Sequence, residues 1–226
     1  MTMEHLKRAA YFGNPFIGLF FRTNGKSTLF PNDTPGKLVE SVCESLGTSP
    51  VITNIEGTNL NGLYIAMNAN GMIVPKFVSA EEQNRLEKET GISVYASKEK
   101  LNAHGNNVAL NDMGGIISPR VKEIEKKAME ECLGIELIPM EIAGYTAVGS
   151  LCVANNKGFL AHYAVDEREL LAMGEALKVK GMPGSVNLGN GFVRVGMLAT
   201  DKGYFAGDKT SAFELGRAEE ALGFLD

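Results

Sequence analysis

A pattern of strand-forming and turn-forming residues recurs five times along the chain, at intervals of about 44 residues. Each copy has two short stretches of branched and aromatic residues, separated by a turn that contains Asn or Asp and a glycine. Such a pair is typical of a β-hairpin, and self-similarity at this period predicts a repeat architecture. The recurring turn glycines are spaced by 46, 44, 43 and 45 residues and lie at Gly25, Gly71, Gly115, Gly158 and Gly203.

A helical pattern follows each hairpin. In the first and third repeats the apolar residues fall on one helix face, at Leu38, Val39, Val42, Cys43 and Leu46, and at Val121, Ile124, Ala128 and Cys132. Helix starts are predicted from proline or a capping box, at Thr34-Pro35, Ser118-Pro119, Ser79–Glu82 and Ser211–Glu214. Helix ends are predicted at Gly47, Gly91, Gly134 and Gly223. Short strands such as ISVYA and IELIPMEI come next, so the predicted unit is strand–strand–helix–strand in an α/β fold.

The second helix is the most polar of the five. Between Ser79 and Gly91 only Ala80 and Leu86 are apolar. We therefore expect this helix to be the most exposed to solvent.

The last repeat lacks its final strand, since only Phe224, Leu225 and Asp226 follow Gly223. The chain has unused residues, Leu6 to Phe12, before its first hairpin. We predict that they pair with the fifth repeat and close the repeats into a ring. This prediction makes residues 1–226 a single domain, with repeats at approximately 8–56, 57–100, 101–143, 144–188 and 189–226.

Composition narrows the class of protein. The chain has 22 Lys and Arg against 27 Asp and Glu, a net charge of −5, which argues against a protein that mainly grips phosphate backbones. Cys43, Cys132 and Cys152 are too few and too scattered for a disulfide framework or a zinc site, so we expect free thiols. Asn14 and Pro15 interrupt the apolar N-terminal stretch, and no apolar run approaches the ~20 residues that span a bilayer. We expect a cytoplasmic protein with no membrane contact.

Motifs for cofactors are incomplete. Gly189-x-Gly191 lacks the third glycine of a dinucleotide site, and Gly25-Lys26-Ser27 lacks the upstream glycine of a phosphate loop. The histidines His5, His104 and His162 fall in different repeats, which disfavours a metal site. The helices rich in Glu and Lys are interpreted as solvated faces. We therefore expect no cofactor and no metal.

One pair of residues carries a catalytic alternative. Cys152 and His162 flank the turn at Asn155–Gly158 almost symmetrically, so they could face each other on one hairpin. A thiol beside an imidazole is the beginning of a nucleophilic site. The favoured interpretation is that Cys152 is a small buried apolar residue and that His162 ends a strand.

Uncharged polar residues gather next to glycines in the loops. They are consistent with simple turn chemistry and also with a rigid docking face for another macromolecule. These residues are Asn14, Asn68, Asn106, Asn107, Asn111, Asp112, Asn155 and Asn156.

Several blocks resemble, in order and spacing, the archaeal and eukaryotic translation initiation factor six family. They are NGLYIAMNANGMIVP, LNAHGNNVALND, AVGSLCVANNKGFLAH and GSVNLGNGFVRVGMLATDKGYFAGDKTSAFEL, and the resemblance runs from about Ala9 to the C-terminus. It implies the pentein fold, a fivefold pseudosymmetric α/β propeller. The long C-terminal tail of eukaryotic members is absent, so the chain resembles the archaeal type.

The resemblance implies a ribosome anti-association factor that is not an enzyme. Family members bind the large ribosomal subunit and keep the small subunit away. They dock chiefly on the fourteenth large-subunit ribosomal protein, near the sarcin–ricin loop of the large rRNA. Release involves a translocase-like GTPase and the Shwachman–Bodian–Diamond protein. An acidic chain suits a basic ribosomal partner, and a closed ring favours a monomer.

The resemblance also implies a set of ribosome-binding residues. They fall in loops that we expect at one edge of successive repeats: Asn14, Gly18, Gly62, Asn68, Asn106 and Asp112. One contact is not carried over, because Leu63 stands where eukaryotic members have an arginine. The alternative from another class is a pentein-type guanidine-modifying hydrolase, which would require an activated Cys152.

Overall fold

The computed structural model describes residues 6–225, and these residues contain five three-stranded sheets. In each sheet, two strands of one repeat form an antiparallel hairpin. A further strand pairs parallel to the second strand of that hairpin. This is the predicted strand–strand–helix–strand unit. The first four sheets comprise β2 (Arg22–Thr23), β3 (Ser27–Phe30) and β4 (Ser49–Ile52); β5 (Ala66–Met67), β6 (Gly71–Pro75) and β7 (Ser93–Ser97); β8 (Val108–Leu110), β9 (Gly115–Ile117) and β10 (Leu137–Pro139); and β11 (Cys152–Ala154), β12 (Phe159–His162) and β13 (Gly181–Gly184).

The fifth sheet contains strands from both ends of the chain. β14 (Met197–Ala199) and β15 (Tyr204–Gly207) form its hairpin, and β1 (Leu6–Ala9) pairs parallel to β15, with Leu6 opposite Tyr204. The Nη1 atom of Arg8 also donates to the carbonyl oxygen of Thr210 at 2.7 Å. The predicted pairing of the N-terminal segment with the fifth repeat is confirmed for Leu6–Ala9.

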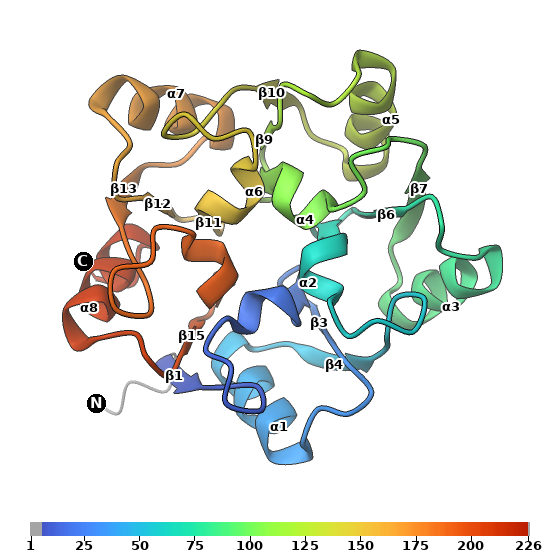
Figure 1. Ribbon diagram of the computed structural model, residues 1–226, viewed down its shortest axis with the longest axis horizontal. Helices are drawn as coiled ribbons and strands as arrows, with labels where there is room; N and C mark the ends of the chain where they lie inside the picture. The colour runs from blue at the N-terminus through green and yellow to red at the C-terminus, as the bar shows by residue number, and fades with distance from the viewer. Residues whose placement is uncertain (1–5, 226) are drawn as a thin grey trace.

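Helices of two kinds surround a central axis (Figure 1). Long helices lie at the periphery: α1 (Gly36–Leu46), α3 (Ala80–Thr90), α5 (Glu123–Leu133), α7 (Glu167–Leu177) and α8 (Ala212–Ala221). Short helices lie next to the axis: η1 (Ile17–Leu19), α2 (Asn61–Tyr64), α4 (His104–Asn107), α6 (Val148–Leu151) and η2 (Val193–Gly196). The sequence patterns predicted the long helices, but they predicted extended strand where the short ones lie.

Each hydrophobic cluster lies between two successive sheets and is covered by one long helix. For example, Val153 and Leu160 of the fourth sheet pack with Met197 and Tyr204 of the fifth and with Ala218 of α8. The second strand of each hairpin is buried on both faces, so these strands are mostly apolar on both sides. One cluster joins the fifth sheet to the first through Leu198, Phe205, Phe30, Val42 and Leu46.

The helix ends follow most of the predicted signals. Gly47, Gly91 and Gly134 end their helices in the left-handed conformation, with φ of 63°, 70° and 65°. The capping box at Ser211 and Glu214 is confirmed. The start predicted at Ser118-Pro119 is wrong, because α5 begins at Glu123 after a turn. As predicted, α3 is the most exposed long helix, with Leu86 its one buried residue.

The hairpin turns begin with an amide or hydroxyl side chain that accepts from two backbone N–H groups. Asn155 Oδ1 accepts from Lys157 N at 2.9 Å and from Gly158 N at 2.8 Å. The equivalent residues are Asn24, Asn68, Asn111, Asn155 and Thr200. The fourth position of the turn is Ser27, Gly71, Gly114, Gly158 and Gly203. Gly25 lies within its turn as predicted, although two residues before the fourth position, whereas the predicted turn glycine is wrong at Gly115, which lies one residue after the turn in β9.

The glycine at the fourth position is required by the neighbouring repeat. A Cβ atom at Gly158 would overlap the carbonyl oxygen of Ala221 in α8. The Nδ2 atom of Asn155 donates to the carbonyl oxygens of Thr200 at 2.9 Å and Leu222 at 3.1 Å. Four of the five turns thus satisfy a free carbonyl group at the end of the next long helix, whereas Asn24 Nδ2 in the first turn has no partner among the described residues.

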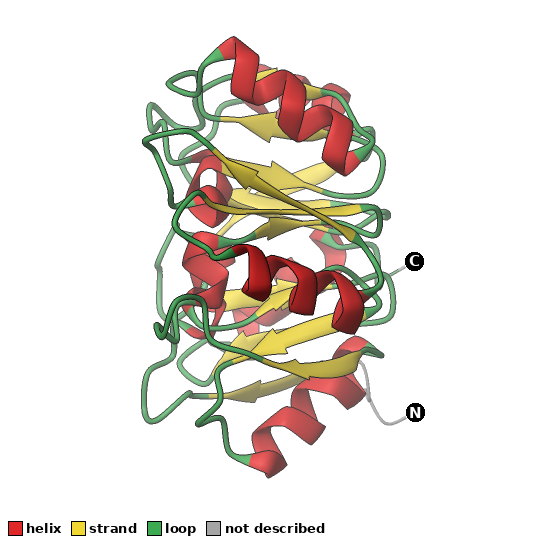
Figure 2. Cartoon of the chain, turned by 90° about the vertical axis from the view of Figure 1, so that its right-hand side faces the viewer, coloured by secondary structure: helices red, strands yellow, loops and turns green. Residues whose placement is uncertain are grey.

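The strands run along the axis, so their two ends lie on opposite faces of the molecule (Figure 2). We call one the helical face; it carries the short helices and the loops that precede them. We call the other the turn face; it carries the five hairpin turns, from Asn24–Ser27 to Thr200–Gly203.

Candidate functional site

Glycine lines the axis of the helical face in four repeats. A Cβ atom at Gly62 would overlap the carbonyl oxygen of Gly18, and one at Gly105 would overlap that of Gly62; Gly149 is placed in the same way. In the fifth repeat Arg194 takes this position. Its Nη1 and Nη2 atoms donate to the carbonyl oxygens of Gly18 at 3.0 Å and Gly62 at 2.7 Å. Arg194 is 3% exposed and fills the axis.

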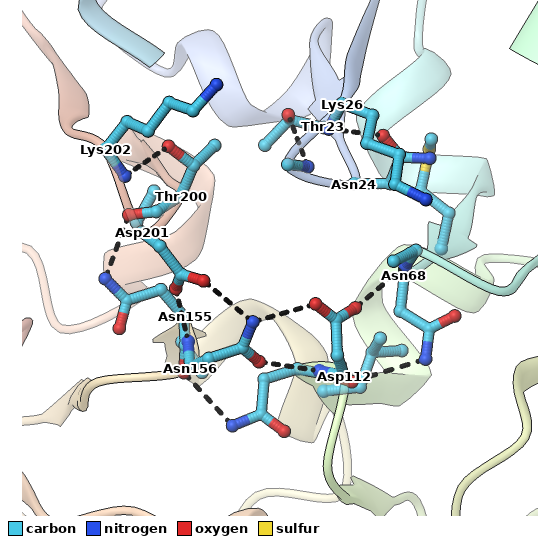
Figure 3. A pocket seen from close by; sticks show the side chains of 17 residues that line it. Thr23, Asn24, Lys26, Asn68, Asp112, Asn155, Asn156, Thr200, Asp201 and Lys202 are labelled. Atoms are coloured by element: carbon cyan, nitrogen blue, oxygen red, sulfur yellow. Dashed lines mark hydrogen bonds between the residues drawn. The ribbon is translucent and has the colours of Figure 1, made fainter. Parts of the chain in front are cut away.

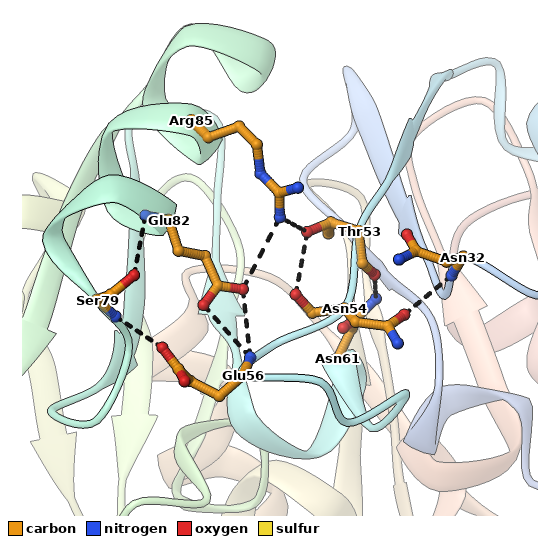
Figure 4. Close-up of polar contacts among 8 residues, drawn as sticks. All are labelled: Asn32, Thr53, Asn54, Glu56, Asn61, Ser79, Glu82 and Arg85. Carbon is orange, nitrogen blue, oxygen red and sulfur yellow. Dashed lines mark hydrogen bonds and ion pairs between the residues drawn. The ribbon is translucent and has the colours of Figure 1, made fainter.

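Tight turns on the helical face are fixed by glutamates at the starts of the long helices (Figure 4). Glu82 in α3 accepts from the backbone N–H of Glu56 at 3.3 Å, and Glu56 in turn accepts from Ser79 N at 2.9 Å. The same contact recurs from Ala143 N to Glu169 at 2.7 Å and from Gly189 N to Glu214 at 2.8 Å. The interpretation of Glu82 as part of a solvated helix face is therefore wrong, since this carboxylate positions a turn.

Tight turns on this face also hold large apolar side chains out in solvent. Phe12 and Leu188 are 68% and 74% exposed, at left-handed residues with φ of 48° and 65°. Their turns are neighbours, because Asn187 Nδ2 donates to the carbonyl oxygen of Pro15 at 3.0 Å.

An aromatic group continues this surface onto the fourth repeat. The His162 ring stacks on Tyr163 with centroids 4.4 Å apart, and the Tyr145 ring lies 5.8 Å from His162. Tyr145 is 46% exposed and Tyr163 is 59% exposed. We call Phe12, Tyr145, Tyr163 and Leu188 the apolar surface. Exposed apolar side chains gathered on rigid turns are typical of a surface that binds a macromolecule.

Four of the six predicted binding residues lie on the helical face. Asn14 Oδ1 accepts from Phe16 N at 2.8 Å, just before η1. Gly18 and Gly62 are buried at the axis. Asn106, in α4, has a buried Oδ1 atom with no hydrogen-bond partner among the described residues.

The other two predicted residues lie on the turn face, at the mouth of a cavity (Figure 3). Asn68 is 2% exposed, and its Nδ2 atom donates to the carbonyl oxygen of Leu133 at 3.0 Å. Asp112 accepts from Ala69 N and from Asn156 Nδ2, each at 2.8 Å. The expectation that all six residues share one edge is therefore wrong. Asn68 and Asp112 join repeats to each other.

The pairing of Cys152 with His162 is not formed. Cys152 lies opposite Ala161 in the hairpin, and consecutive side chains on a strand point to opposite faces. Cys152 is 2% exposed in an apolar cluster, and this burial raises the pKa of its thiol. His162 Nδ1 accepts from Ala164 N at 3.0 Å, and burial lowers the pKa of His162. The interpretation of Cys152 as a small buried apolar residue is confirmed.

Residues 6–225 contain no group of three or more His, Cys, Asp or Glu side chains that could hold a metal ion. Within the same range, no helix combines the length and the apolar character needed to cross a membrane.

Sequence reasoning missed three buried polar side chains. Arg22 and Arg194 are 8% and 3% exposed, and His104 is fully buried. A signal existed for Arg194, because it falls at the position occupied by Gly18, Gly62, Gly105 and Gly149 when the repeats are superimposed. No local pattern marks Arg22.

Comparisons with known proteins agree over nearly the whole chain. The sequence model of the eIF-6 family matches residues 6–221. A protein of Saccharolobus islandicus named translation initiation factor 6 is 34% identical over 221 residues, which cover 97% of this chain and 99% of the relative. Proteins of the same name from Pyrobaculum aerophilum and Haloquadratum walsbyi are 34% and 31% identical, over 94% and 97% of this chain and 96% and 97% of the relatives. This chain belongs to the eIF-6 family.

Proposed function

We propose that the chain is a translation initiation factor that binds the large ribosomal subunit and prevents the small subunit from joining it. The observation that carries this proposal is the family match over residues 6–221, together with relatives that are named translation initiation factor 6. The factor would act by occupying the joining face rather than by catalysis. The arrangement of five sheets about an axis supports its classification as a pentein, a closed fivefold α/β propeller.

The helical face is the docking face in this proposal. It presents the apolar surface on turns that hydrogen bonds hold in place, so little conformational entropy is lost when a partner binds. Asn106 lies on this face with no hydrogen bond from its side-chain nitrogen to any described residue, whereas Asn68 and Asp112 are engaged on the opposite face.

A basic partner fits the charge of the chain. The net charge is −5, and complementary potentials aid encounter and register. The expected partner is the fourteenth large-subunit ribosomal protein near the sarcin–ricin loop. Release would then need a separate protein machinery, for which a GTPase with a Shwachman–Bodian–Diamond-type protein is the candidate.

Sucrose-gradient sedimentation with purified subunits tests the function. The wild-type chain should travel with the large subunit and not with the small one, and it should reduce joining of the two. Binding should weaken as salt rises, though less steeply than for a protein that grips phosphates. If the chain fails to travel with the large subunit, or travels equally with both, the proposal is wrong.

A pair of matched variants tests the face. Leu188→Asn removes an exposed leucine while keeping a residue that accepts the left-handed conformation. Leu171→Gln is the control, since Leu171 is 72% exposed on the peripheral helix α7. Losing one buried leucine contact should weaken binding by about ten-fold, and the control should bind as wild type.

Asn106→Ala should weaken binding less than Leu188→Asn. Its Oδ1 atom is already buried within the chain, so only the Nδ2 donor is open to a partner. If wild type binds but Leu188→Asn binds equally well, the function stands and the choice of face is wrong.

A further inference from the structure

A small inner cavity lies on the axis between the two faces, with a volume of about 50 Å³. Arg22, Cys152 and Arg194 contribute to its wall, and none of the described residues that line it is acidic. It lies next to the outer cavity of the turn face, of about 250 Å³, since Thr23 and Met67 line both.

Arg22 is a buried cation without a partner. Its side chain is 8% exposed, its Nε atom is buried and unpaired, and within residues 6–225 its guanidinium makes no hydrogen bond or ion pair. The strand register shows that the other repeats carry an apolar residue here. These residues are Ala66, Ala109, Val153 and Leu198.

Arg194 adds a second cation to the same wall. Two of its nitrogens bind the carbonyl oxygens of Gly18 and Gly62, but its Nε atom is buried and unpaired. Burial lowers the pKa of Arg22 to about 10. Burial, together with the nearby charge of Arg22, lowers the pKa of Arg194.

Two buried guanidinium groups with no carboxylate beside them need a counter-charge. A guanidinium does not lose its proton in proteins, and leaving such a charge buried and unpaired is strongly unfavourable. The five N–H donors of a guanidinium match the oxygens of a planar or tetrahedral oxyanion, often through two parallel hydrogen bonds. The cavity exceeds the roughly 10–15 Å³ that a single water molecule requires.

We propose that the inner cavity binds one small inorganic oxyanion, of the size and charge of phosphate, between Arg22 and Arg194. The anion accepts hydrogen bonds from the terminal nitrogens of Arg22, and the charge of Arg194 in the same wall adds electrostatic attraction. It joins the first repeat to the fifth from inside the molecule. This inference does not depend on the ribosomal role of the helical face.

The turn face offers a route for an anion. Lys26 and Lys202 lie at the mouth of the outer cavity (Figure 3). The carboxylates at the same mouth are already engaged, since Asp112 and Asp201 both accept from Asn156 Nδ2, at 2.8 Å and 2.9 Å. The charges of the two lysines offset those of the two carboxylates, so the mouth carries no net negative charge that would repel an anion.

Thermal unfolding and calorimetric titration with inorganic phosphate test the proposal, with sodium chloride added to hold ionic strength constant. Calorimetry of the wild type should show one saturable site. A ligand that binds only the folded chain raises the ratio of folded to unfolded protein about eleven-fold at ten times its dissociation constant, which corresponds to a rise of ~4 °C in melting temperature. Arg22→Leu introduces the residue that the fifth repeat has at this position. This variant should lose both the binding heat and the phosphate-induced rise in melting temperature. Arg120→Leu removes an exposed arginine and should keep them.

Phosphate also stabilises proteins in general, because it is excluded from their surface. This general effect is distinguishable, because the melting temperature then rises with phosphate concentration without saturation and does so in every variant. An unsaturable rise shared equally by wild type, Arg22→Leu and Arg120→Leu would overturn the proposal. So would the absence of binding heat in the wild type, or a saturable response to chloride alone. If Arg22→Leu does not fold, Arg22→Lys, which keeps the charge and loses the fork, should bind phosphate at least ten-fold more weakly than wild type. Equal binding by Arg22→Lys would also overturn it.

Discussion

The Nη1 atom of Arg194 donates a hydrogen bond of 3.0 Å to the carbonyl oxygen of Gly18, which lies 176 residues earlier in the chain. The contact depends on the missing side chain at Gly18, because a Cβ atom there would overlap the backbone oxygen of Arg194. The centre of the helical face is therefore built from backbone contacts that leave no space for a methyl group.

Replacing an axial glycine should destabilise the whole chain. Gly105→Ala would place a Cβ atom on the carbonyl oxygen of Gly62, and neither backbone can move without displacing the next repeat. We expect a loss of about 3 kcal/mol or more in the free energy of unfolding. Gly216→Ala is the control, because nothing lies within 4 Å of its Cβ position in α8; it should gain about 0.5–1 kcal/mol. Urea unfolding of both variants measures the difference, and a Gly105→Ala variant as stable as wild type would contradict this account.

The stability of the chain should depend on pH through His104. Its two ring nitrogens are buried without hydrogen-bond partners among the described residues, and burial lowers its pKa to about 4. In the unfolded chain the pKa is about 6.5. Between these values only the unfolded chain takes up the proton, so stability is full above pH 6.5 and falls as pH drops toward 4, by up to about 3 kcal/mol.

His104→Val is the matched variant for this effect. The equivalent position holds Val148 in the fourth repeat and Val193 in the fifth, both fully buried. At pH 7 the variant should lose little stability, and between pH 6.5 and 4.5 its free energy of unfolding should fall less than that of wild type. Parallel pH dependences in the two proteins would show that His104 does not carry the effect.

Removing the first strand should weaken the fold far more than its length suggests. A chain without residues 1–9 leaves β15 unpaired on one side and loses the contact from Arg8 to Thr210. An uncovered sheet edge also favours aggregation. We expect the melting temperature to fall by about 10 °C or more. A chain without residues 1–5 keeps β1 and is the control; equal melting of the two truncated chains would contradict the role of β1.

Cys152 should resist modification in the folded protein. It is 2% exposed, and the pKa of its thiol is raised by burial, so little thiolate forms. With a thiol reagent at pH 8, mass spectrometry should find Cys152 unlabelled until the chain is unfolded, while the half-buried Cys43 reacts earlier. Rapid labelling of native Cys152 would revive the catalytic alternative. Cys152→Ala should cost about 1–2 kcal/mol of stability through lost packing.

The repeat and its order of elements could be predicted from the sequence because they depend on local signals. Asn155 and Gly158 mark a hairpin, and Ser211 with Glu214 marks a helix start, whatever surrounds them. The exact position of the turn glycine could not be read in this way. Gly25 and Gly115 are as good locally as their neighbours, and the contact that selects Gly158 comes from Ala221 in the next repeat.

The short helices and the two faces also required the structure. Four residues such as His104–Asn107 form a single helical turn, which is too short to show a helical period. Asn68 in its hairpin turn and Asn106 in α4 both belong to polar segments beside short strands, and nothing local shows that these segments lie at opposite ends of the strands. Arg22 could not be recognised from its local sequence, because it stands out only by comparison with the apolar residues at the equivalent position of the other four repeats.

Because the fifth sheet contains strands from both ends of the chain, it can form only when synthesis is nearly complete. Leu6 pairs with Tyr204, so the first strand made must wait for almost the last. Translation at roughly 5–20 residues per second separates the two by on the order of 10–40 s. During that interval earlier repeats can pack on one another, but the nascent chain presents an open sheet edge at each end. The fold is therefore completed only as the chain leaves the ribosome, whose large subunit is, by our proposal, its binding partner.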